Sequence, residues 1–153
     1  WPNRRKMSGF AYWNSGSTAY SKLMEAKAEL ISSGLSPALL ELVFLKISQI
    51  NGCSYCIALH CKAALRAGVS ETQIKQVRFT NLSDEFSELE RAAIRWAESV
   101  TTLTNVANVS AKREAIASMI TLRQLTDLTV AIGIMNALNR LSIALGNPVG
   151  ANI

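Results

Sequence analysis

Apolar residues recur at three- and four-residue spacing along most of the chain, and helix-start and helix-stop residues bound each run. Ser17 begins a run that Gly34 ends, and Ser36-Pro37 begins one that Asn51-Gly52 ends. Serine side chains cap helix N-termini, proline suits the first turn, and glycine suits the residue after the last turn. Strand-like alternation is nearly absent. The pattern predicts an all-α fold.

Five further helices are expected in the rest of the chain. One extends from about Cys53 to Ala67 and is closed by Gly68, and another begins after Ser110 and reaches Met119 and Ile120. The other three begin at capping-box sequences, namely Ser70–Gln73, Ser87–Glu90 and Thr121–Gln124. We find no linker, repeat or low-complexity tract. Residues 1–16 are therefore predicted to form an N-terminal arm and residues 17–153 a single domain.

Two of these helices depart from a simple amphipathic pattern. In the first, Lys27 interrupts the apolar stripe, so this helix is expected to be partly buried. The last helix is apolar around nearly its whole circumference, and such a helix is normally buried on all sides. Its apolar residues are Leu125, Leu128, Val130, Ile132, Ile134, Met135, Leu138, Leu141, Ile143 and Leu145. This favours a subunit interface, with a central helix of a monomeric bundle as the alternative.

Composition and charge narrow the class of protein. The 153 residues are 49% hydrophobic with only eight Gly and three Pro, which indicates one folded domain and excludes a disordered or collagen-like chain. The net charge of +5 owes three units to Arg4, Arg5 and Lys6, and no basic stripe typical of nucleic-acid binding follows. The most apolar uncharged stretch, Leu128–Asn139, is too short for a membrane span of about 20 residues. We expect a soluble, cytoplasmic protein.

Reactive side chains converge at one place, the segment that begins at Cys53. On a helix, Cys53, Cys56 and His60 fall within about 60° of one another, so two thiols and the chain's one imidazole share a stripe. Cys53 lies at the helix start, where the macrodipole favours a thiolate. His60 lies one turn after Cys56 and could take the proton of that thiol. The dipole favours Cys53 as the reactive thiol and the histidine favours Cys56; we choose Cys56.

The same residues allow other interpretations. Ile57 follows the second cysteine where attached c-type haem needs a histidine, which excludes haem. Cys61 is rotated about 100° from His60, so one helix cannot close a four-ligand structural zinc site, whereas a three-ligand catalytic zinc stays open. The remaining alternative is two packed thiols with a core histidine. We predict no metal and no cofactor, and a packing role for Cys61.

Glu41 extends the cluster to a pattern that resembles a known family. With Cys53, Cys56 and His60 it is similar to the Glu-x11-Cys-x2-Cys-x3-His signature of the AhpD-like alkylhydroperoxidases, in the carboxymuconolactone decarboxylase superfamily. The resemblance continues through Gln49–Gly52, Ala67-Gly68, Glu90–Glu98 and Asn136–Leu141, and so covers most of residues 36–146.

This resemblance implies an AhpD-like helical bundle, assembled into homo-oligomers (trimers or hexamers), that reduces organic and hydrogen peroxides. It implies that Cys56 attacks the peroxide, that Cys53 resolves the sulfenic acid to a disulfide, and that Glu41 and His60 form the proton relay. A lipoyl-bearing protein or another dithiol would then reduce the disulfide. Asn136, Asn139 and Arg140 resemble a polar trio of the family's last helix, which we interpret as intersubunit hydrogen bonding.

Two departures from the family pattern matter. Tyr55 occupies a position where alkylhydroperoxidase D has a histidine, so Tyr55 either donates a hydrogen bond in the proton network or packs. The true decarboxylases lack the cysteine pair, which argues against decarboxylase activity here. Two alternatives to a peroxidase remain: a disulfide oxidoreductase or redox sensor with little peroxidase turnover, and a non-redox oligomeric small-molecule-binding protein.

Overall fold

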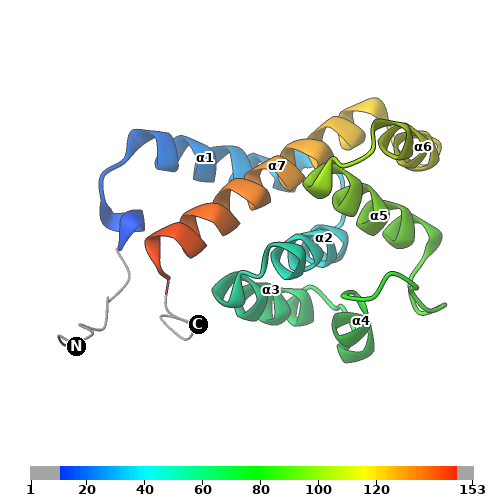
Figure 1. Cartoon of the computed structure of the whole chain (residues 1–153), viewed down its shortest axis with the longest axis horizontal. Helices are drawn as coiled ribbons and strands as arrows, with labels where there is room; N and C mark the ends of the chain where they lie inside the picture. The colour runs from blue at the N-terminus through cyan, green and yellow to red at the C-terminus, as the bar shows by residue number, and fades with distance from the viewer. Residues whose placement is uncertain (1–10, 148–153) are drawn as a thin grey trace.

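The computed structural model describes residues 11–147, and every regular element in that part of the chain is a helix (Figure 1). This confirms the all-α prediction. In chain order the elements are the 3-10 helix η1 (Tyr12–Asn14), α1 (Thr18–Glu29), the 3-10 helix η2 (Leu30–Ser33), α2 (Pro37–Asn51), α3 (Ser54–Arg66), α4 (Glu71–Gln76), α5 (Glu88–Thr102), α6 (Val106–Ala117) and α7 (Leu122–Leu145).

Most predicted helix starts are confirmed by their caps. The side chains of Ser17, Ser36, Ser70, Ser87 and Thr121 each accept a hydrogen bond from a backbone N–H in the first turn that follows. The predicted start at Ser110 is wrong, because α6 begins at Val106. Its cap is Asn105, whose Oδ1 accepts from the backbone N–H of Asn108 at 3.2 Å. Asparagine and serine are equally good caps, so the cap residues alone do not decide between the two starts.

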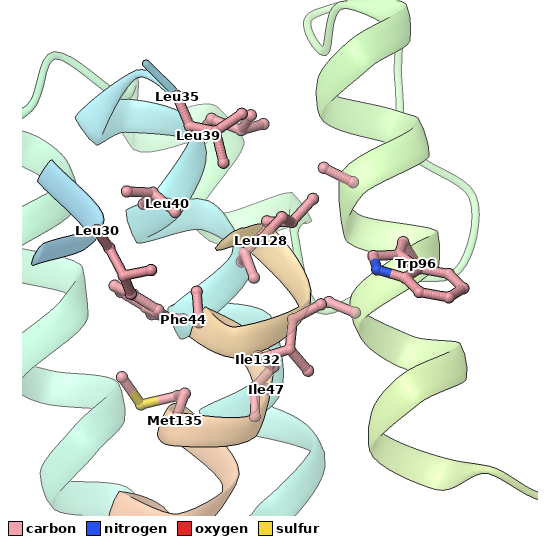
Figure 2. Packing of buried hydrophobic residues seen from close by; sticks show 14 of the residues in the cluster. Leu30, Leu35, Leu39, Leu40, Phe44, Ile47, Trp96, Leu128, Ile132 and Met135 are labelled. Atoms are coloured by element: carbon pink, nitrogen blue, oxygen red, sulfur yellow. The ribbon is translucent and has the colours of Figure 1, made fainter. Parts of the chain in front are cut away.

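Helix α2 is the one that the rest of the described chain encloses. Residues 42–48 are buried without a break, and α2 packs on α3, α5 and α7. Leu39, Leu40 and Phe44 contribute to a first core cluster shared with α5 and α7 (Figure 2). Leu42 and Leu45 contribute to a second cluster. Within one chain, therefore, α2 and not the last helix is surrounded on all sides.

Helix α7 lies along one side of this core. Leu128, Ile132 and Met135 are buried in the first cluster, whereas Val130 is 45% exposed and Leu122 is 79% exposed. Among the described residues α7 is the helix long and apolar enough to cross a membrane, with a mean hydropathy of 1.5 over an 18-residue window. The sequence prediction considered only the uncharged stretch Leu128–Asn139 and so underestimated this apolar length. Its inner face packs on α2 and α5, so we describe it as a core helix of the bundle.

A buried amide network joins the end of α2 to α7. Asn51 Nδ2 donates to Asn136 Oδ1 and to Asn139 Oδ1, both at 3.0 Å, and Asn139 Nδ2 donates to Ser48 Oγ at 3.1 Å. Arg140 Nη1 donates to the backbone and side-chain oxygens of Asn136. The polar trio therefore finds hydrogen-bond partners inside the chain, and intersubunit bonding of these residues stays a prediction. The network fixes the turn from which α3 starts.

Candidate active site

Cys53 and Cys56 form a disulfide at the N-terminus of α3. Gly52 adopts the left-handed conformation (φ 70°) that ends α2, and Cys53 becomes the N-cap of the next helix. The Cα atoms of the two cysteines are 5.3 Å apart, and Cys53 Sγ accepts from the backbone N–H of Cys56 at 3.3 Å. The residues are 1% and 5% exposed, respectively. Helix geometry thus places both sulfurs where the macrodipole favours a thiolate.

The structure brings His60 of α3 and Glu41 of α2 together across the helix pair. His60 Nδ1 lies 2.7 Å from Glu41 Oε2, and the carboxylate side chain is 20% exposed whereas the imidazole is buried. An ionised carboxylate only accepts hydrogen bonds, so Nδ1 carries the proton and Nε2 is left to exchange one. The ring of Phe44, 5.3 Å from the imidazole centroid, holds the histidine from α2.

A cavity of about 200 Å³ opens onto Cys56 and His60. Tyr55 also lines it, as do Met135, Leu138 and Ser142 of α7. Cys53 is not among the residues that line this cavity. A small molecule that enters this cavity therefore meets the Cys56 side of the disulfide.

Five further residues of this cavity, all from η1 and α1, were not assigned to the site from the sequence: Tyr12, Trp13, Tyr20, Met24 and Lys27. The Tyr12 ring packs edge-on against Trp13 and Tyr20, with centroids 5.2 and 5.5 Å away, and its hydroxyl accepts from Asn147 Nδ2. Burial raises the pKa of Tyr12 and of Tyr20. All three tyrosines of the chain line this cavity, and the crowding of aromatic residues before Ser21 was the available signal.

A second cavity, of about 360 Å³, adjoins the first and is mainly apolar. Met24 and Lys27 line both cavities, and Glu41 lines only the second. The Lys27 ammonium lies 5.3 Å from the centroid of the Phe44 ring. Burial lowers the pKa of Lys27, and the nearby Glu41 carboxylate acts in the opposite direction. The other lining residues are Ala28, Leu30, Ile31, Leu35, Pro37, Leu40 and Phe44.

The third cysteine lies apart from the disulfide, in a different environment. Cys61 is a free, half-buried thiol that packs against the second core cluster, and burial raises its pKa. Among residues 11–147 no three His, Cys, Asp or Glu side chains gather closely enough to hold a metal ion. The arrangement at α3 is instead a redox-capable sulfur pair with a histidine and carboxylate beside it.

Comparison with known proteins places this geometry in context. The family model described as the carboxymuconolactone decarboxylase family matches residues 17–99, more than half of the chain. The uncharacterized protein YdfG of Bacillus subtilis is 29% identical over 125 residues, 82% of this chain and 85% of YdfG. The uncharacterized protein YnjA of Escherichia coli is 31% identical over 117 residues, 76% of this chain and 63% of YnjA.

A solved structure matches the fold over almost the whole chain. It is a protein of unknown function from Agrobacterium tumefaciens, proposed to be the antioxidant defence protein AhpD. The TM-score is 0.85 at 26% sequence identity, over 94% of this chain and 98% of that one. The AhpD-like architecture expected from the sequence is thereby confirmed.

Proposed function

Since the chain belongs to the carboxymuconolactone decarboxylase family, we propose that it is a thiol-dependent peroxidase of the AhpD type, which reduces organic hydroperoxides or hydrogen peroxide. One observation carries the proposal. A Cys53–Cys56 disulfide presents Cys56 to a cavity, beside a histidine whose Nδ1 is 2.7 Å from the Glu41 carboxylate. The antioxidant role proposed for the Agrobacterium tumefaciens protein supports the same assignment.

Catalysis starts from the dithiol form. His60 Nε2 takes the Cys56 proton, and the thiolate attacks one peroxide oxygen, so that an S–O bond forms while the O–O bond breaks. The departing alkoxide receives the proton back from His60 and leaves as an alcohol, or as water when hydrogen peroxide is the substrate. The sulfur is oxidised to sulfenic acid, and the peroxide is reduced by the same two electrons.

Cys53 then resolves the sulfenic acid. Its thiolate attacks Cys56 Sγ, the S–S bond forms, the S–O bond breaks, and hydroxide leaves with a proton as water. An external dithiol returns two electrons and two protons by thiol–disulfide exchange. Both sulfurs are nearly buried, which favours a small dithiol, or a lipoyl group on a flexible arm, over a thiol on a globular surface.

The carboxylate and the tyrosine have distinct roles in this scheme. Glu41 fixes the tautomer of His60 and stabilises the imidazolium that forms when Nε2 takes the thiol proton. In this scheme Tyr55 donates a hydrogen bond to the peroxide, which its position in the lining of the same cavity supports. No metal and no cofactor takes part.

Stopped-flow oxidation of the reduced protein by an organic hydroperoxide tests the assignment. We expect Cys56→Ser to abolish peroxide reduction, Cys53→Ser to accumulate the sulfenic acid after one turnover, and Cys61→Ser to behave as the unmodified protein. Retention of full activity by Cys56→Ser would refute the mechanism.

A disulfide oxidoreductase or redox sensor is the second candidate, because the disulfide is present and the Sγ of Cys53 is held at a helix N-terminus. A sensor would be oxidised by peroxide but turn over slowly with a dithiol. Comparing the oxidation rate with the steady-state rate separates the two functions.

We also propose a cellular compartment and an oligomeric state for the protein. The cytoplasm suits the reaction, because its reducing thiol pools favour re-reduction of a catalytic disulfide. We further propose a homo-oligomer, a trimer or hexamer, in which residues 17–153 form the single domain of each subunit.

A further inference from the structure

Lys27 is the feature of this site that the peroxidase scheme leaves unused. It interrupts the apolar stripe of α1, and the structure places it on the wall shared by the two cavities. Among the described residues no carboxylate lies within ion-pair distance of its ammonium, whereas Lys22, Lys46 and Lys75 all have such partners. Lys27 is thus a half-buried cation whose charge is not matched by a direct partner.

The neighbouring carboxylate does not cancel that charge by contact. Glu41 lies near enough to favour the charged form of Lys27, but its Oε2 is held by His60. The Lys27 ammonium packs instead over the face of Phe44, a weak electrostatic contact that leaves its N–H donors free for a ligand.

The second cavity supplies an apolar volume directly beside this cation. About 360 Å³ is within the usual size of small-molecule sites, which combine apolar walls with a few placed polar groups. Most of its walls are aliphatic or aromatic, and Lys27 and Glu41 are its charged residues. An alkyl chain that ends in an anionic group such as a carboxylate matches an apolar cavity with a free ammonium at its edge.

We propose that Lys27 and the second cavity form a binding site for amphipathic carboxylates, with the carboxylate on the Lys27 ammonium and the alkyl chain along Leu35, Leu40 and Phe44. Because Lys27 also lines the cavity of Cys56, a ligand held there lies next to the disulfide. This inference extends the proposed peroxidase function. Its consequence for substrates rests on that function: the protein should reduce hydroperoxides that carry a carboxylate in preference to neutral ones.

Ligand binding tests the site without any peroxidase turnover. The disulfide form of the full chain is titrated with octanoate and with methyl octanoate, by calorimetry. We expect Lys27→Met to weaken octanoate binding about tenfold, the value of one charge-assisted hydrogen bond, and to leave methyl octanoate unaffected. Lys27→Arg should retain octanoate binding, and so should Lys22→Met, which removes an exposed ammonium of the same helix.

A second variant tests the apolar part of the site. Ile31 is 84% exposed and lines the second cavity, so Ile31→Asp leaves the core intact. It should weaken both octanoate and its ester. The proposal is overturned if Lys27→Met leaves octanoate affinity unchanged, if it weakens acid and ester equally, or if neither ligand binds, as would follow if a second copy of the chain covered Ile31.

The substrate consequence has its own measurement. With reduced protein we expect a hydroperoxy fatty acid to react about tenfold faster than its methyl ester, and Lys27→Met to bring this ratio close to one. If the protein reduces no peroxide but Lys27-dependent octanoate binding persists, the peroxidase function fails and the binding site stands. If it reduces acid and ester equally, the substrate preference fails and the peroxidase function stands.

Discussion

The hydrogen bond between His60 and Glu41 is the contact on which the proposed chemistry depends most at the level of single residues. In Glu41→Gln the amide can still accept from His60 Nδ1 but carries no charge to stabilise an imidazolium. We expect the rate constant for Cys56 oxidation to fall about a hundredfold, the usual contribution of general acid–base catalysis. Stopped-flow tryptophan fluorescence would measure it, because Trp13 lines the reacting cavity.

A matched control for Glu41→Gln lies on the neighbouring helix. Glu29, the exposed last residue of α1, lines neither of the two cavities, so Glu29→Gln should leave the rate unchanged. A rate for Glu41→Gln within twofold of the unmodified protein would remove Glu41 from the relay.

Cys61 offers a prediction on pH dependence. Burial raises the pKa of its thiol, so at neutral pH a smaller fraction is thiolate than in an exposed cysteine, and only the thiolate reacts. In a Cys53→Ser/Cys56→Ser variant, where Cys61 is the one thiol left, iodoacetamide should react more slowly than with a peptide cysteine. The midpoint of the alkylation rate against pH, followed by mass spectrometry, should lie above that of the peptide. A midpoint at or below the peptide value would contradict the raised pKa of Cys61.

At the level of elements, the amide network between α2 and α7 is expected to fix the turn before Cys53. Asn139 is fully buried and satisfies both Asn51 and Ser48. Asn139→Leu removes both of these hydrogen bonds, whereas Asn51 Nδ2 keeps Asn136 Oδ1 and the Ser48 hydroxyl still donates to the Phe44 carbonyl. We therefore expect the free energy of unfolding to fall by about 1–2 kcal/mol. Urea unfolding measures the loss. Asn81→Ala, in an exposed loop position, should change it by less than about 0.5 kcal/mol.

Helix boundaries were predictable where one local signal acts alone and failed where two compete. Ser36-Pro37 has no rival start nearby, and α2 begins there. Ser110 and Asn105 are both adequate caps, and the sequence offers no local reason to prefer the earlier one. Val109 and Ile116 pack in the first core cluster, and Val109 lies in the turn that the earlier start adds to the helix. Periodicity cannot reveal such a tertiary contact.

The candidate site likewise contains residues that local spacing indicates and residues that only long-range packing brings in. Glu41, Cys53, Cys56 and His60 lie on two helices joined by the Gly52 turn. The helical spacing indicated that Cys53, Cys56 and His60 share a stripe, and the family resemblance added Glu41. Tyr12, Tyr20 and Lys27 reach the same cavity because α1 folds back over the bundle beside α7, as Figure 1 shows. Such long-range packing leaves only indirect traces in a sequence, here a lysine in an apolar stripe and a cluster of aromatics.

For the whole molecule, the apolar face left exposed by α7 predicts how copies of the chain associate. Leu122 and Val130 border a shallow apolar depression with Leu125 and the buried Trp96, on the side of α7 away from the residues that line the Cys56 cavity. Exposed apolar residues that gather around one depression are typical of interfaces. We expect the chain to be oligomeric and Val130→Lys to dissociate it, because the substitution buries an unpaired charge in the interface.

Sedimentation velocity at matched concentrations distinguishes this face from any other. Leu65 on α3 is similarly exposed, at 49% against 45% for Val130, but lies outside the depression, so Leu65→Lys should keep the oligomer mass. Circular dichroism of Val130→Lys would establish that its subunit stays folded. A monomeric unmodified chain, or a Val130→Lys variant that keeps the unmodified mass, would contradict the assignment. A monomer that retains thiol oxidation by peroxide would also show that one subunit holds the complete Glu41–His60–Cys56 site, as its geometry within one chain implies.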